Sequence, residues 1–157
     1  MRGRTSVAPV SVSRLAVSAT NHCLTGCGIG EVLGLVLATW WGWGDAASIA
    51  LAVGLAFLFG YSLTMIPLLR AGTALGAAIG IALVADTLSI ATMELTDNAI
   101  LLAWPGAMDA GLGDLLFWGP LAIALAVAWG PTFLVNRALI RRGKGHALAH
   151  AAHSRHA

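Results

Sequence analysis

Four acidic residues of this 157-residue chain lie inside two long hydrophobic segments that contain no Lys or Arg. They are Glu31, Asp86, Glu94 and Asp97. An ionisable group inside a lipid bilayer is costly and suggests a functional role. A carboxyl group without a cationic neighbour must stay protonated, share a proton, reach water or bind a cation. These residues therefore point to the handling of protons or metal cations.

Three of the carboxyl groups fall on one side of the segment 73–104. At 100° per residue, one narrow stripe of a helix carries Asp86, Ser89, Met93 and Asp97, flanked by Thr87, Glu94 and Asn98. A polar face cannot contact lipid, so it faces protein or a cavity. We expect a proton or ion path along Asp86, Glu94, Asp97 and Asn98. The alternative is that these groups only hydrogen-bond across a helical bundle.

A pair of thiols precedes the first carboxyl group. Cys23, Cys27 and Glu31 recur at i, i+4 and i+8, on the same helical face as the small residues Gly26, Gly30, Gly34 and Ala38. Small residues allow close helix approach, so this face should lie in a helix–helix contact. We expect a metal site for Cu(I) or Zn(II) made by His22, Cys23, Cys27 and Glu31.

Two other interpretations of the thiols remain open. They could be small apolar residues in a tight contact, or a redox pair that cycles through a disulfide. If the segments that begin at residues 21 and 73 are neighbours, the thiols and His22 lie near the inner face. Glu31 and Asp86 then lie near the middle, and Glu94 and Asp97 towards the outer face.

The composition is that of an integral membrane protein. The chain is 58% hydrophobic and 10% charged with a mean hydropathy of +0.82, whereas soluble domains carry about a quarter charged residues. We predict an all-α, polytopic fold with one domain at 21–142 and four transmembrane helices, at about 21–43, 46–69, 73–104 and 114–140. The basic residues form short clusters without interleaved aromatic residues, so no nucleic acid is expected as a partner.

The charges also predict an orientation. With four spans, all nine Lys and Arg residues fall on one side, while Asp45, Asp109 and Asp114 fall on the other. The positive-inside rule then places both termini in the cytoplasm. We expect a disordered N-terminal arm at 1–20 and a His-rich cytoplasmic tail at 143–157. Asp109 and Asp114 could line a vestibule for cations or only solvate their loop.

The tail contains His146, His150 and His153, at i, i+4 and i+7. His-rich tracts bind Zn, Ni or Cu, so these residues form a weak candidate metal site. The alternative is a disordered, weakly basic tail with no bound metal.

Several strings resemble a known family. They are 22–31 (HCLTGCGIGE), 85–90 (ADTLSI) with Glu94, Asp97 and Asn98, 105–111 (PGAMDAG), 135–137 (VNR) and 143–146 (GKGH). Together, over residues 21–147, they resemble small bacterial membrane proteins known only as a domain of unknown function. The resemblance implies a bacterial origin, the four-helix layout and a His-rich terminus that favours metal binding. It implies no catalytic role.

The sequence thus predicts a multi-pass protein of the bacterial inner membrane that binds or transports a cation, most simply a transition metal. One copy makes a thin bundle, so a homo-oligomer is one way to build a pore. The first alternative is an interaction protein whose acidic helix pairs with a cationic transmembrane partner. The second is a membrane thiol oxidoreductase that uses Cys23 and Cys27. No Walker loop, Rossmann fingerprint or HExxH motif is present, so no catalytic residues are assigned.

Overall fold

The computed structural model describes residues 11–143, which form four long α-helices. These helices are α1 (Val12–Trp41), α2 (Asp45–Arg70), α3 (Leu75–Ala103) and α4 (Leu115–Arg141). All four are long and apolar enough to cross a membrane, and residues 11–143 contain no strand. The prediction of an all-α, polytopic membrane protein with four spans is confirmed.

The helix bounds agree with the expected spans within two residues, except at the start of α1. This helix begins at Val12 because the Ser11 side chain caps it, accepting a hydrogen bond from the backbone N–H of Arg14 at 3.3 Å. Ala16 and Thr20 are already buried against the bundle. The expectation of a disordered arm over 1–20 is therefore wrong for residues 12–20, and residues 1–10 lie outside the described range.

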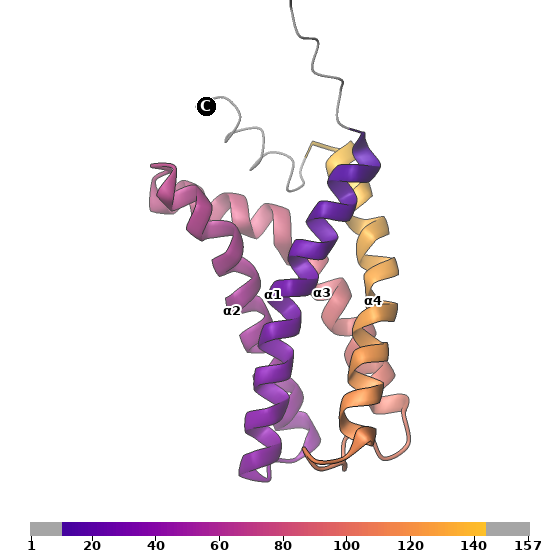
Figure 1. Cartoon of the computed structure of the whole chain (residues 1–157). Coiled ribbons are helices and arrows are strands. Elements are labelled where there is room, and N and C mark those ends of the chain that lie inside the picture. Colours follow the sequence, from indigo (N-terminus) through magenta and orange to yellow (C-terminus); the bar gives the residue numbers. More distant parts are fainter. Residues whose placement is uncertain (1–10, 144–157) are drawn as a thin grey trace, which may run out of the picture.

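Consecutive helices run antiparallel and form a four-membered bundle (Figure 1). Each helix contacts the next one along the chain, and α4 closes the ring against α1. α1 also contacts α3 across the centre of the bundle. The start of α1 and the end of α4 lie at the same end, where α2 and α3 turn away from them (Figure 1).

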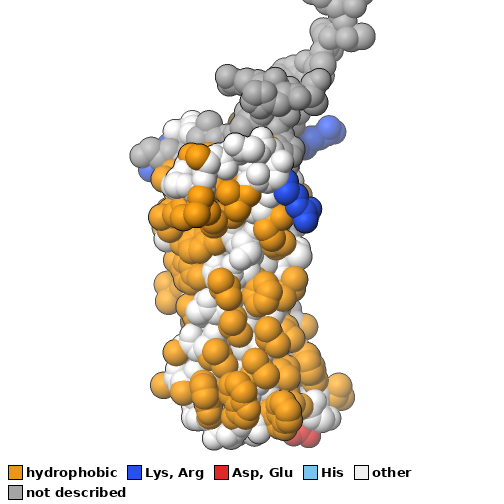
Figure 2. All heavy atoms as spheres, turned by 90° about the vertical axis from the view of Figure 1, so that its left-hand side faces the viewer, with side chains coloured by type: hydrophobic (Ala, Val, Ile, Leu, Met, Phe, Trp, Pro, Cys, Tyr) orange, Lys and Arg blue, Asp and Glu red, His pale blue; other side chains and the backbone are white. Residues whose placement is uncertain are grey.

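Apart from the four buried carboxyl groups, the charged residues of the described chain separate between the two ends. One end carries the arginines at the start of α1 and the ends of α2 and α4: Arg14, Arg70, Arg137, Arg141 and Arg142. The opposite end carries Asp45, Asp109 and Asp114, with exposed tryptophans at 40, 41, 43, 104 and 118. Figure 2 shows a hydrophobic band between a basic and an acidic end. This is the pattern of a membrane-spanning bundle with an interfacial aromatic belt.

Glycines allow α1 to lie unusually close to α2. A Cβ atom added at Gly26 would meet the Cα of Gly60 at 2.8 Å, and one added at Gly34 would collide with the Cα of Ala52. At Gly30 it would collide with the backbone of Ala56. The small-residue face of α1 expected from the sequence is thus confirmed as a helix–helix contact.

This contact predicts opposite effects for two glycines of α1. Gly30→Ala should lower the free energy of unfolding by about 1–3 kcal/mol, because the new methyl group overlaps the α2 backbone. Gly28→Ala should leave it unchanged or raise it by up to about 1 kcal/mol, because only a Leu125 methyl group lies nearby, at 3.9 Å. Unfolding measured in detergent checks both variants. Equal stability of the two would contradict the close α1–α2 packing.

Candidate functional site

Three carboxyl groups from two helices meet inside the bundle. Glu31 of α1 and Asp97 of α3 are both 0% exposed, and Glu94 of α3 is 4% exposed. The Glu31 carboxyl interacts with those of Asp97 and Glu94 across the contact between the two helices. We call Glu31, Glu94 and Asp97 the carboxyl cluster. Because α1 and α3 are diagonal partners, the cluster lies in the interior of the bundle and not on its lipid-facing surface.

The protein supplies few hydrogen-bond donors to this cluster. Asn98 is the main one: its side-chain N–H groups donate to Asp97 Oδ1 at 3.1 Å and to Glu94 Oε2 at 3.5 Å, and its backbone N–H donates to Asp97 Oδ1 at 2.6 Å. The Glu31 and Asp97 carboxyl groups hydrogen-bond to each other, which requires a proton on one of them, and Cys27 hydrogen-bonds to Glu94. Five oxygens of the cluster and of Asn98 meet no amide or hydroxyl donor among residues 11–143. They are Glu31 Oε1 and Oε2, Glu94 Oε1, Asp97 Oδ2 and Asn98 Oδ1.

The thiol pair adjoins the carboxyl cluster. Cys23 and Cys27 are free and buried, their Sγ atoms lie 3.7 Å apart, and Cys27 also interacts with Glu94. Both cysteines pack in an apolar layer with Ile90 and Met93. His22 turns towards α2, where its Nε2 lies 3.2 Å from Thr64 Oγ1.

The four residues expected to form an inner metal site are therefore only partly brought together. Within residues 11–143, no three His, Cys, Asp or Glu side chains are arranged so that they could hold a metal ion. The candidate tail site at His146, His150 and His153 lies outside the described residues.

A second polar layer lies nearer the basic end. Ser89 Oγ of α3 donates to Asn136 Oδ1 of α4 at 2.5 Å, and Asn136 Nδ2 donates to Thr20 Oγ1 of α1 at 3.0 Å. Thr20 in turn donates to the carbonyl oxygen of Ala16 at 2.7 Å. Asp86, one turn before Ser89 on α3, is also buried. All members of this chain are buried, and it joins three helices.

Asn136 and Thr20 were missed as site residues in the sequence. A signal was present for Asn136, because an amide in an otherwise apolar span has to find a partner inside the bundle. Thr20 gave none, because a threonine in a membrane helix can satisfy its own hydroxyl with the carbonyl four residues earlier.

The polar groups thus form two layers separated by an apolar one. From the acidic end, the order on α3 is Asp97 and Glu94, then Met93 and Ile90, then Ser89 and Asp86. The expected depths placed Glu31 level with Asp86, but in the structure Glu31 interacts with Asp97. This expected depth of Glu31 is therefore wrong. The physical reason is the early start of α1, which places Glu31 further along the bundle.

Comparison with known proteins identifies the family of this chain. A family model described as "Domain of unknown function (DUF4396)" matches residues 13–145. The chain belongs to this family. No curated protein and no solved structure gave a match. The DUF4396 match covers all four helices, so both polar layers lie within the family's own domain.

The two layers predict opposite stability changes. Glu31→Gln should raise the free energy of unfolding by about 1 kcal/mol, because it removes a buried acid and gives Asp97 Oδ2 an amide donor. Ser89→Ala should lower it by about 1–3 kcal/mol, because Asn136 Oδ1 loses its donor. Unfolding in detergent measures both. Destabilisation by Glu31→Gln would mean that the carboxyl cluster is a structural contact.

Proposed function

We propose that this chain is a multi-pass membrane protein that binds protons or a small cation at the carboxyl cluster and passes them along the bundle interior. The observation that carries the proposal is a group of five buried oxygens on Glu31, Glu94, Asp97 and Asn98 that meet no amide or hydroxyl donor of the described chain, beside a hydrogen bond between two carboxyl groups, Glu31 and Asp97. Buried polar groups in proteins are nearly always hydrogen-bonded. Bound protons, a cation or water can supply the missing partners of acceptor oxygens in a low-dielectric interior, and a proton- or cation-binding site uses the first two.

The second polar layer shows what a structural contact in this bundle looks like. In the chain of Thr20, Asn136 and Ser89, each donor meets an acceptor on another helix or on the backbone. The carboxyl cluster has a surplus of acceptors instead. A set of groups that served only to hold helices together would not bring three acids into one place, because like charges repel.

The location of the acids also bears on the partner model. Asp86, Glu94 and Asp97 are all buried within the bundle of a single chain. A partner helix packed on the outside of the bundle would not reach them with a Lys or Arg side chain. The cation-binding function therefore has more support than a role in pairing with a cationic subunit.

A transition metal at the thiols is a second candidate, favoured by one distance. Two thiolates on a tetrahedral Zn²⁺ are about 3.8 Å apart, given Zn–S bonds of about 2.3 Å. The Sγ atoms of Cys23 and Cys27 are 3.7 Å apart. Glu94, which hydrogen-bonds to Cys27, is a source of an oxygen ligand beside the thiols. A side-chain rearrangement would be needed to complete the site, since no group of three ligands exists within residues 11–143.

For the cellular setting we propose the bacterial inner membrane with both termini in the cytoplasm. The support is that the arginines of the described chain gather at the end where α1 begins and α4 ends. In this orientation the carboxyl cluster lies closer to the outer surface than the thiols do. A homo-oligomer would add further helices around this thin bundle.

Flux across reconstituted vesicles tests the proposal. Purified protein in liposomes should carry protons, reported by an internal pH dye, or Zn²⁺, reported by an internal chelating dye. Glu31→Gln and Asp97→Asn should each reduce the flux to the protein-free background, because both remove a carboxylate from the cluster. Cys23→Ala/Cys27→Ala should leave proton flux unchanged and abolish only Zn²⁺ flux.

The matched control is Asp114→Asn, which removes a carboxylate outside the bundle and keeps a side-chain oxygen that can accept the hydrogen bond from Gly111 N, 2.9 Å long in the wild type. It should carry the wild-type flux. Two results would refute the proposed role of the cluster: wild-type vesicles that carry neither protons nor Zn²⁺, and carboxyl variants that both keep the full flux.

A further inference from the structure

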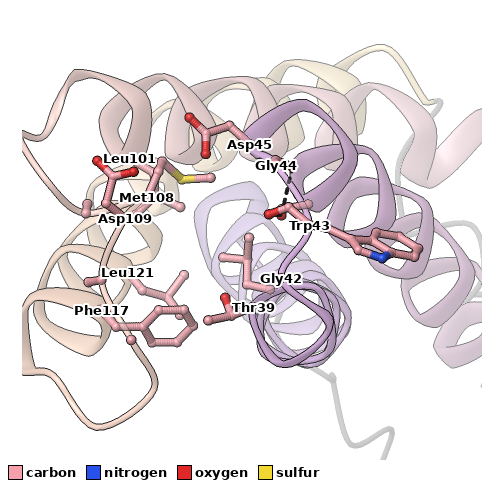
Figure 3. A pocket seen from close by; sticks show the side chains of 15 residues that line it. Thr39, Gly42, Trp43, Gly44, Asp45, Leu101, Met108, Asp109, Phe117 and Leu121 are labelled. Atoms are coloured by element: carbon pink, nitrogen blue, oxygen red, sulfur yellow. Dashed lines mark hydrogen bonds between the residues drawn. The ribbon is translucent and has the colours of Figure 1, made fainter.

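A cavity of about 320 Å³ opens at the acidic end of the bundle. Its walls come from the end of α1, the start of α2, the α3–α4 loop and the start of α4. Figure 3 shows Asp45 and Asp109 on one side of it with Met108 between them, and Phe117 and Leu121 on another side. Both aspartates are exposed, so they lie where the cavity meets water. No Lys or Arg among residues 11–143 lines it.

The sequence left open that Asp109 and Asp114 both line a vestibule for cations. In the structure Asp109 lines this cavity and Asp114 does not. Its Oδ2 accepts the hydrogen bond from Gly111 N and so fixes the turn that carries Asp109. The acidic wall is completed by Asp45, the first residue of α2.

The deep end of the cavity lies next to the carboxyl cluster. Leu35 and Leu101 line it, and they are 5% and 3% exposed. Leu35 follows Glu31 by four residues, and Leu101 follows Asp97 by four residues. Four residues are one helical turn, or about 6 Å along the axis. The two leucines belong to one apolar cluster, which therefore separates the cavity from the carboxyl groups.

We propose that this cavity is the vestibule through which cations or protons reach the carboxyl cluster, and that Leu35 and Leu101 form the barrier between the two. The inference rests on the proposed function for the identity of what passes. Acidic residues at the mouth of a low-dielectric cleft concentrate cations and repel anions. An apolar constriction between two polar regions controls passage by excluding water until the side chains separate.

Thiol labelling tests the vestibule without any measurement of flux. In a Cys23→Ala/Cys27→Ala background, Thr39→Cys puts a thiol on the cavity wall and Glu31→Cys puts one behind the leucines. Leu95→Cys is the control, because Leu95 is 76% exposed on the outer surface of the bundle, next to Glu94 in the sequence, and should face lipid there. The probes are a cationic trimethylammonium methanethiosulfonate and an anionic sulfonate methanethiosulfonate, applied to protein in lipid nanodiscs.

The cationic probe should label Thr39→Cys about tenfold faster than the anionic probe, after correction for their rates with free cysteine. Adding Asp45→Asn/Asp109→Asn should abolish this preference, since these are the acidic residues that line the cavity. Glu31→Cys should stay unlabelled, as should the control Leu95→Cys. When Leu35→Ala/Leu101→Ala is added, Glu31→Cys should become labelled and Leu95→Cys should not.

Two results would overturn the inference. An unreactive Thr39→Cys, or one without charge preference, would show that the cavity does not concentrate cations. Rapid labelling of Glu31→Cys with both leucines in place would show that no barrier exists. If labelling follows expectation while Glu31→Gln leaves flux unchanged, the vestibule stands and the proposed function fails, so the two can be judged separately.

Discussion

The close contact between α1 and α2 determines how the interior of this bundle is built. Glycines on α1 face Ala52, Ala56 and Gly60 of α2, so the two backbones nearly touch. α1 contacts α2, α3 and α4, and its buried face carries both thiols and Glu31. With side chains larger than glycine at the contact, α1 would move outwards and Glu31 would no longer face Asp97. The position of the thiols and carboxyl groups thus depends on the packing of the small residues.

Lipid offers no hydrogen bonds, so each buried polar group has to find its partner inside the protein. The layer of Thr20, Ser89 and Asn136 meets this requirement fully. In the carboxyl cluster, Asn98 supplies the amide donors, and Glu31 and Asp97 hydrogen-bond to each other, but further carboxyl oxygens stay without an amide or hydroxyl donor. An apolar layer separates this cluster from the satisfied one. Local departures from good packing and pairing are typical of functional sites, where stability is given up for activity. The contrast between the two layers is the main physical reason for assigning a function to the cluster.

Helix count, bounds and buried faces could be predicted because they follow from local patterns. Hydropathy gave the spans, and the 100° periodicity of α3 predicted which of its faces is buried, as the burial of Asp86, Ser89, Met93 and Asp97 confirms. Relative depth could not be predicted, because it depends on where α1 begins, and Ser11 is only a weak local signal for that. The cavity depends on how the ends of all four helices and their connecting loops come together at one end of the bundle, which no single stretch of sequence specifies.

The central claim is that the buried carboxyl groups exchange protons or cations with the solution. Infrared difference spectroscopy of the protonated carboxyl C=O stretch tests it most directly, on reconstituted protein taken through a pH or cation titration. The account predicts a band that changes reversibly along the titration and is altered or lost in Glu31→Gln. A carboxyl band that stays constant throughout, or that Glu31→Gln does not affect, would contradict it and leave the cluster a structural feature of the bundle.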